Sequence, residues 1–303
     1  MIGYSHPLYA CSLSEFGQPL QLPASGGWIL QRPVRYTSYH DGMSCYPILT
    51  CNDWTHLRED LESLAPKLLT LAVVLDPFAP LAPEDLHGMF QIVKPFKKHF
   101  IVDLSQHPTK DINKHHRYYA QKALKTLRVE MATDPSAHLE EWIGLYSNLI
   151  QRHALAGIKA FSSQSFAIQF QVPGLVMFRA LQGDQVVGAH LWFLDSGVAY
   201  SHLAAFTNEG YEVGAAYALY WEAIRIFGEQ LDGKVRTMDL GAGAGTSDDA
   251  NDGLTRFKRG WTPAVRTKYF CGRIYDLARY EEVNRLANVT TPDYFPAYRA
   301  GEF

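Results

Sequence analysis

The chain has 303 residues, of which 47% are hydrophobic and 19% are charged, and its formal net charge is −3 at pH 7. This composition excludes wholesale disorder and a generally cationic nucleic-acid-binding protein, and the length suits one large domain or two modest ones. No apolar run approaches the ~18–20 residues of a transmembrane helix, and the first residues lack a signal-peptide pattern. The four cysteines form no C-x-x-C pair and are expected to be reduced thiols. We therefore expect a cytoplasmic α/β protein with no membrane insertion.

The first third of the chain contains two short strands. Residues 68–75 and 99–104 are apolar, rich in β-branched side chains and bounded by turn-forming residues, which is typical of buried strands. Residues 53–64 and 84–93 show the apolar spacing of helices. This alternation predicts a small α/β layer.

The segment 94–128 is strongly basic. It holds nine Lys or Arg residues against two acidic ones, a local charge of +7, so the rest of the chain sums to −10. Asp111 is expected to cap a helix whose polar face carries four basic residues, Lys114, His115, Lys122 and Lys125. That face is either solvated or directed at phosphate. We place the domain boundary here, between residues 1–111 and 112–303.

The second half of the chain predicts a regular order of elements. Helices at 137–153 and 163–170 precede strands at 175–181, 185–194 and 198–206. Turn sequences around Gly183 and Gly197 separate these strands, so they should form an antiparallel meander. A long helix from about Val213 leads to a strand at 235–240, a glycine-rich loop, a strand at 265–275 and a last helix.

The glycine-rich loop at 239–245 reads D-x-G-x-G-x-G, a motif of S-adenosylmethionine-dependent methyltransferases. That motif requires a helix directly after the glycines. A polar loop follows here instead, and only 58 residues remain after Gly245, too few for the later strands of a doubly wound domain. A methyltransferase is therefore a minor alternative.

Taken in order, six pieces of the second half resemble the GNAT superfamily of N-acetyltransferases in its FemAB-like, CelD-like branch. The pieces are NKHHRYYAQKA (113–123), LQGDQVVGAHLWF (181–193), YEVGAAYALYWEAI (211–224), MDLGAGAG (238–245), the acidic Asp248 and Asp249, and LTRFKRGW (254–261). The resemblance covers residues 112–290. It implies a GNAT fold, an α/β (α+β) structure with a mixed, mostly antiparallel central sheet flanked by helices. It also implies a tandem in which residues 1–111 form a reduced GNAT-like domain and 112–303 the acyltransferase domain.

The resemblance implies that the donor, acetyl-coenzyme A or another acyl-coenzyme A, binds where strand 198–206 leads into the long helix. Four residues at the helix start, Val213, Gly214, Ala215 and Ala216, would receive the pyrophosphate on backbone N–H groups. Ala205 and Phe206 end the preceding strand and would line the same site. Tyr211 stands where the family usually has Gln or Arg. An ordinary, tightly packed helix start is the alternative interpretation.

Three residues are candidates for proton transfer or substrate contact on the strands. His202 has a suitable unperturbed pKa for a general base, although a hydrogen-bonded core histidine is an equal alternative. Tyr200 on the same strand and His190 on the neighbouring one are candidate substrate contacts.

Four further candidates follow the long helix. Asp239 could receive a proton or orient an acceptor ammonium, or else cap the loop that it introduces. Lys258 matches the lysine that the resemblance places in the active site, where it would stabilise negative charge. Arg256 and Arg259 could contact substrate phosphate. The alternative for all three basic residues is a solvated helix face.

Together these features predict an N-acyltransferase that moves an acetyl or other acyl group from acyl-coenzyme A to an amine of a small molecule or amino sugar by direct attack. The expectation includes no metal and no DNA. An aminoacyl-tRNA-dependent FemAB-type transferase is the first alternative because of the basic segment. The missing helical hairpin, which such enzymes often carry, disfavours tRNA. A non-catalytic binding protein on the same fold is the other alternative.

Overall fold

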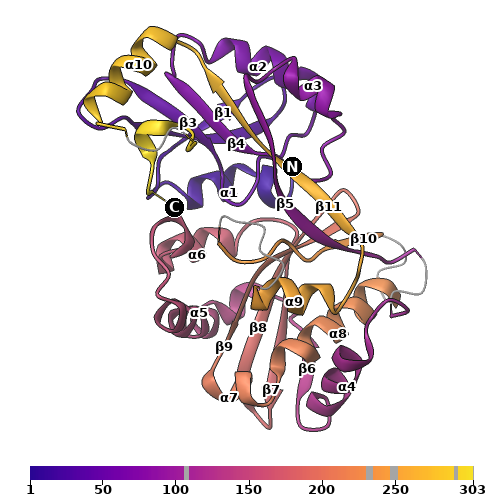
Figure 1. The fold of residues 1–303 in the computed structure, drawn as a ribbon. Helices are drawn as coiled ribbons and strands as arrows, with labels where there is room; N and C mark the ends of the chain where they lie inside the picture. The colour runs from indigo at the N-terminus through magenta and orange to yellow at the C-terminus, as the bar shows by residue number, and fades with distance from the viewer. Residues whose placement is uncertain (106–108, 230–234, 246–251, 290–292, 303) are drawn as a thin grey trace. The chain divides into compact units, whose positions relative to one another are not determined.

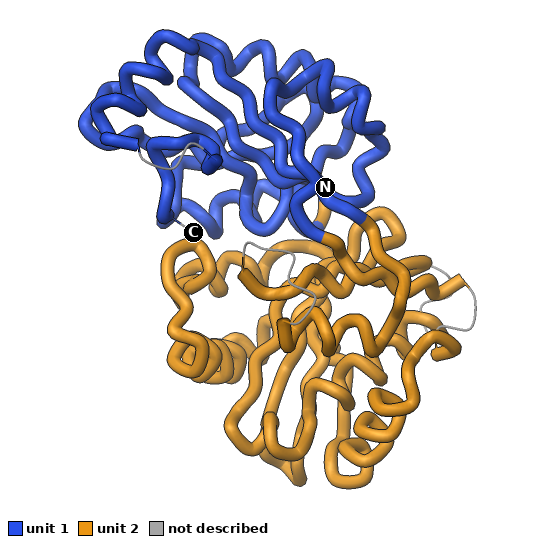
Figure 2. Tube along the Cα trace, viewed as in Figure 1, with its two compact units in different colours: residues 1, 3–97, 267–303 blue, residues 2, 98–266 orange. Residues whose placement is uncertain are grey.

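The computed structural model describes the chain except for residues 106–108, 230–234, 246–251, 290–292 and 303. It divides into two compact units (Figure 2): unit 1 comprises residues 1, 3–97 and 267–303, and unit 2 comprises residues 2 and 98–266. The chain crosses from unit 1 to unit 2 within β5 (Ile92–Asp103) and returns within β11 (Val265–Ile274). This division differs from the expected one at residue 111, because residues 267–303 group with the N-terminal part of the chain.

Unit 1 is built on a mixed sheet. β1 (Gln18–Leu22), β2 (Gly27–Pro33) and β3 (His40–Ser44) form an antiparallel meander. β4 (Thr70–Val74) runs parallel to β3 and antiparallel to β11. The helices of this unit are α1 (Pro7–Ser12), α2 (Leu57–Ser63), α3 (Pro83–His87) and α10 (Leu277–Leu286).

Unit 2 has a longer sheet with one parallel pair. β6 (Arg128–Met131), β7 (Leu175–Gln182), β8 (Gln185–Asp195) and β9 (Val198–Phe206) are antiparallel in sequence order. β10 (Thr237–Asp239) is parallel to β9 and antiparallel to the end of β5. Gly183 and Gly197 have φ of +61° and +83° in the hairpin turns, which confirms the meander.

The two units repeat one order of elements. In each, a meander is followed by a helix, then a strand parallel to the last meander strand, then an antiparallel strand on its far side. That last strand comes from the other half of the sequence in both cases, because β5 pairs with β10 while β11 pairs with β4. This architecture confirms the expected mixed, mostly antiparallel fold flanked by helices.

Helices cover both faces of the unit 2 sheet (Figure 1). α5 (Leu139–His153) and α6 (Ser163–Gln169) lie on one side, and α4 (Lys114–Ala123) and α8 (Ala215–Glu229) lie on the other. The core beneath α8 includes Trp192, Phe227 and Met238.

The basic helix α4 begins later than expected. The predicted cap at Asp111 is wrong, because Asn113 Oδ1 accepts the N–H of His116 at 2.7 Å. The predicted polar face is exposed as expected, at Lys114, His115, Lys122 and Lys125.

All four cysteines are free thiols. Among the described residues, no helix is both long and apolar enough to cross a bilayer.

Candidate active site where β9 and β10 separate

β9 and β10 run side by side for three residues and then part. The paired positions are Val198 with Thr237, Ala199 with Met238, and Tyr200 with Asp239. Beyond Asp239 the chain follows β5, since Leu240 N–H donates to Phe100 O at 2.9 Å and Phe100 N–H donates to Gly241 O at 3.1 Å. The edge of β9 after Tyr200 is therefore not paired with β10. The sheet of unit 2 opens at this point.

A β-bulge lies directly beside the opening. Leu191 pairs with Leu203 while the next residue of β8, Trp192, pairs with Ser201, so His202 is an extra residue in β9. Bulges bend a strand and redirect its side chains, and they are common beside active sites. The opening thus coincides with a local break in the regular ladder.

Asp239, the last residue of β10, is buried and heavily hydrogen-bonded. His99 Nδ1 lies 2.7 Å from its Oδ2 and 2.9 Å from its Oδ1, and Gly241 N–H donates to Oδ1 at 2.7 Å. Burial raises the pKa of Asp239, but His99, the Gly241 N–H and the Lys258 ammonium outweigh it and hold that pKa below its ordinary value. The carboxyl group is therefore ionised at neutral pH.

Lys258 brings a positive charge to the same place. It lies on α9 (Gly253–Arg259), whose first turn is capped by Asp252 accepting the Thr255 N–H at 2.8 Å. Its side chain is buried, and Nζ donates to Ala242 O at 2.7 Å in the glycine-rich loop. Its charge acts on both Asp239 and His190. A buried ammonium beside the end of β10 is suited to stabilise a developing negative charge.

The glycine-rich loop lies in contact with the Lys258 side chain. Gly241 has φ of +75°, and a Cβ there would lie 3.0 Å from Lys258 Nζ. A Cβ on Gly243 would come within 1.9 Å of Thr255 Oγ1, so the loop packs directly on α9. Among the described residues, the next helix after the glycines begins at Gly253, and β10 is antiparallel to β5. These features do not match the methyltransferase arrangement. The motif residues Asp248 and Asp249 lie outside the described part of the chain.

A polar network lies on the α8 side of the opening. His190 Nε2 is 2.8 Å from Ser201 Oγ, and Tyr220 of α8 also hydrogen-bonds Ser201. Burial lowers the pKa of His190 well below its ordinary value and raises that of Tyr220 to about 12. His190 Nδ1 has no hydrogen-bond partner among the described residues. His190 and Tyr220 are thus both neutral at physiological pH.

The other predicted site residues, His202, Tyr200, Arg256 and Arg259, lie in different environments. His202 Nε2 lies 3.0 Å from Gln169 Oε1 of α6, and burial lowers the pKa of His202 to about 3. These observations favour the core histidine over the general base. Tyr200 is buried at the last β9–β10 pair, whereas Arg256 and Arg259 are exposed on α9.

The predicted donor site has the expected glycine turn but an unexpected short helix. Thr207 Oγ1 caps α7 (Asn208–Glu212) by accepting the Gly210 N–H at 3.0 Å, directly after Ala205 and Phe206 end β9. Val213 is the C-cap residue of α7, and Gly214 then adopts a left-handed conformation with φ of +74°. The first two residues of α8 are Ala215 and Ala216. The start of this 15-residue helix therefore follows a left-handed turn at a glycine.

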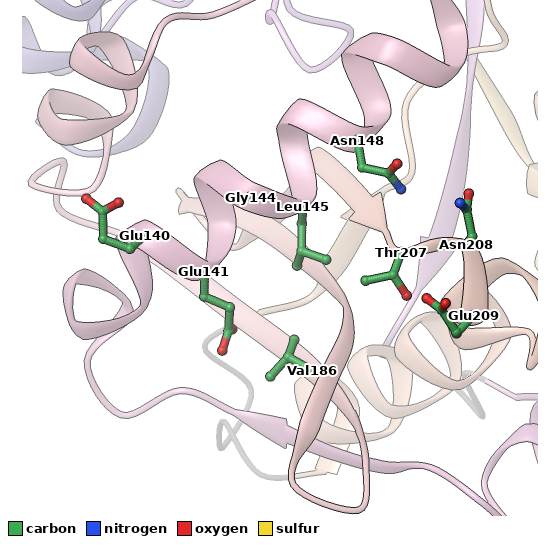
Figure 3. Close-up of a pocket in the computed structure, with 9 residues that line it drawn as sticks. All are labelled: Glu140, Glu141, Gly144, Leu145, Asn148, Val186, Thr207, Asn208 and Glu209. Carbon is green, nitrogen blue, oxygen red and sulfur yellow. The ribbon is translucent and has the colours of Figure 1, made fainter.

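An open pocket of about 440 Å³ lies between α5 and α7 (Figure 3). Its acidic lining residues are Glu140, Glu141 and Glu209, and Glu141 also forms a salt bridge with Arg179 at 2.6 Å. Asn148, another lining residue, donates from Nδ2 to Phe206 O at 2.6 Å. Carboxylates repel phosphate, so we do not expect the donor's phosphates in this pocket.

Sequence reasoning missed four polar residues of this region: His99, Gln169, Ser201 and Tyr220. His99 belongs to a predicted strand, where a histidine inside an apolar run was the available signal. Its partner Asp239 lies 140 residues away in the sequence. Tyr220 has the spacing of a core residue in α8 and is indeed buried.

Comparisons with known proteins place this geometry in a family. Residues 109–259 match the family model described as an acetyltransferase (GNAT) domain. A sequence comparison with curated proteins gives no match. Among solved structures, FemX has a TM-score of 0.65 at 14% identity, over 91% of this chain and 93% of its own.

A C-terminal domain of a putative lysylphosphatidylglycerol synthetase from Agrobacterium fabrum has a TM-score of 0.66 at 12% identity, over 93% and 91% of the two chains. At these identities the likeness to the two solved structures shows the fold alone. The match to the family model includes the side chains described above as site residues, except His99. Residues 109–259 of this chain thus form a domain of the GNAT family.

Proposed function

We propose that unit 2 is an N-acyltransferase that moves an acetyl or other acyl group from acyl-coenzyme A to an amine. The observation that carries this proposal is the separation of β9 from β10 directly beside Asp239 and Lys258. Where β9 no longer pairs with β10, its extended backbone is suited to run beside an amide-containing arm such as pantetheine. In the proposed reaction the coenzyme A thioester is a substrate that is consumed, not a permanently bound cofactor.

Two features suit the two ends of such a donor. The backbone N–H groups at the start of α8, after the Gly214 turn, are suited to the pyrophosphate. The Lys258 ammonium is suited to the carbonyl oxygen of the thioester, because negative charge develops there when an amine attacks. Direct attack needs no covalent enzyme intermediate. The acceptor class that we propose is the amine of a small molecule, such as an amino sugar or amino acid.

A second donor, aminoacyl-tRNA, is favoured by the exposed face of α4. That face combines basic residues with aromatic ones: Lys114, His115, Tyr118, Tyr119 and Lys122. Tyr119 also stacks on Tyr217 of α8, with ring centroids 5.4 Å apart. Basic and aromatic surfaces bind single-stranded nucleic acid. The likeness to FemX is consistent with a FemAB-like branch, in which both donors are used. Against tRNA, none of the described helices exceeds 15 residues.

Native mass spectrometry of the purified protein with acetyl-coenzyme A tests the donor. We expect a one-to-one complex whose affinity changes little between 50 and 200 mM salt. An affinity for aminoacyl-tRNA that falls by roughly 10³-fold or more over this salt range, without binding of acetyl-coenzyme A, would establish the second donor instead. Absence of both complexes would contradict the proposal and favour a non-catalytic protein.

A further inference from the structure

One buried histidine joins the start of α4 to the end of α9, the helix that carries Lys258. His116 is 5% exposed, and its Nε2 lies 2.7 Å from Phe257 O. A carbonyl oxygen only accepts, so Nε2 of His116 carries the hydrogen and donates it. Phe257 directly precedes Lys258, and its carbonyl also accepts the Gly260 N–H at 3.2 Å. The side chain of His116 therefore binds the backbone of α9 at the position next to the lysine.

The position of His116 is itself fixed from several sides. Its Nδ1 lies 3.1 Å from Oδ1 of Asn113, the N-cap residue of α4, and the Asn113 N–H donates to Gly260 O at 3.0 Å. A Cβ on Gly260, the C-cap residue of α9, would come within 2.0 Å of His116 Cε1, so the ring packs directly on that backbone. Burial lowers the pKa of His116, and the ring is neutral at physiological pH. Three aromatic rings have centroids 5.0–5.3 Å from that of the histidine: Tyr217, Phe257 and Trp261.

α9 needs such contacts because it is short. It has seven residues, and isolated helices shorter than ~12–15 residues are marginal in water. Asp252 caps its first turn, and His116 binds its last turn. Lys258 carries its ammonium on a flexible four-carbon stem, so the place of Nζ depends on where the backbone of α9 is held. Stabilisation of a developing oxyanion requires a donor that is already in place.

We infer that His116 is a positioning residue for Lys258: its bond to Phe257 O keeps the Lys258 ammonium where negative charge develops on the thioester carbonyl. This inference rests on the proposed function and adds a residue of α4 to the machinery of that site. His116 contacts no substrate and transfers no proton in this role. Its loss should therefore lower kcat and kcat/KM equally and leave KM for acetyl-coenzyme A unchanged, because only the transition state loses an interaction.

The test compares His116→Leu, which removes the donor, with His116→Gln, whose side-chain amide still donates to Phe257 O. A misplacement of 1 Å costs about 10²-fold, so we expect kcat with acetyl-coenzyme A and an alkyl amine to fall about 10- to 100-fold in His116→Leu. His116→Gln should restore most of it. The control is the exposed His153→Leu at the end of α5, which should leave kcat unchanged. If circular dichroism shows that His116→Leu is unfolded, His116→Asn replaces it, because the shorter amide does not reach Phe257 O.

A double-mutant cycle separates positioning from a general loss of stability. In a Lys258→Met background, His116→Leu should lower kcat by less than about twofold, because the ammonium that it positions is already absent. Losses that multiply would show that His116 acts independently of Lys258 and would overturn the inference. Wild-type activity in His116→Leu, or an equal loss in His116→Gln, would overturn it too.

Nitrogen NMR of the Lys258 side chain gives a readout that needs no turnover. Nζ donates to Ala242 O at 2.7 Å, so we expect a resolved ammonium signal in the wild type and in His116→Gln, and its loss in His116→Leu. Identical spectra of all three proteins would overturn the inference. Wild-type protein that releases no thiol with any amine overturns the acyltransferase proposal, and the NMR comparison then still decides whether His116 holds Lys258 in place.

Discussion

Tyr200 and Asp239 form the last residue pair between β9 and β10, and the two strands separate directly after it. The pairing places the buried Asp239 carboxylate, with its partner His99, where the sheet opens. Lys258 reaches the same point from α9 through its bond to Ala242 O. The proposed chemistry therefore depends on one feature of strand topology, the single parallel pair in the unit 2 sheet.

Lys258→Met should slow acyl transfer while the protein stays folded. Methionine preserves most of the side-chain length but removes the ammonium, and loss of one group that stabilises the oxyanion costs roughly 10²–10³-fold in kcat. Steady-state kinetics measure the loss, and circular dichroism checks the fold. The matched control is Arg256→Met on the exposed face of the same helix, which should stay within about twofold. Full activity in Lys258→Met would remove this lysine from the mechanism.

Gly214→Ala should weaken donor binding and also lower stability. Its φ of +74° is in the left-handed region, so an alanine there costs about 1–2 kcal/mol. If the turn orients the start of α8 toward phosphate, acetyl-coenzyme A affinity should fall about five- to tenfold. Gly157, with φ of +60°, provides a control with the same backbone cost outside the donor site. Equal affinities in Gly157→Ala and Gly214→Ala would argue against this binding site.

Gly260→Ala should destabilise unit 2 through a specific clash. The added Cβ would lie 2.0 Å from Cε1 of His116, whose Nε2 is 2.7 Å from Phe257 O. Overpacking of this kind costs about 1–3 kcal/mol in urea unfolding. Gly253→Ala, where no described atom lies within 4 Å of the added Cβ, should cost much less. Combining Gly260→Ala with His116→Ala should recover part of the loss, and strict additivity would contradict the clash.

His202 should make the protein less stable as the pH falls below 6.5. Burial lowers its pKa to about 3 in the folded state, against 6.5 for an unperturbed histidine. Between these values only the unfolded chain binds the proton, so stability rises with pH across that window and is complete above it. His202→Gln should reduce the slope of unfolding free energy against pH by up to about 1.4 kcal/mol per pH unit. Urea unfolding at pH 4.5, 5.5 and 7.5 measures it. Parallel curves for the two proteins would show that His202 titrates normally.

Local sequence chemistry predicted the elements that depend on it. Glycines at 183 and 197 marked the hairpin turns, and apolar spacing marked α8. The ordered motifs located Lys258 and the Gly214 turn, because each belongs to a contiguous stretch of chain. Short capped helices were harder to predict, and α7 was missed although Thr207 is a suitable N-cap residue.

The pairing of distant segments could not be predicted from the sequence. β5 leaves the N-terminal half to pair with β10, and β11 returns to pair with β4, so neither local periodicity nor turn chemistry specifies the partners. The His99–Asp239 contact exists only because of this exchange. The same limit applies to the contact of His202 with Gln169 of α6, because these residues lie 33 positions apart in the sequence.

The most direct test of the account is product analysis after the protein is incubated with acetyl-coenzyme A and a panel of small amines and amino sugars. The account predicts that one amine is converted to its amide, that free thiol appears in equal amount, and that Lys258→Met abolishes most of both. No amide and no thiol at millimolar acetyl-coenzyme A with folded protein would contradict it, as would transfer from aminoacyl-tRNA alone.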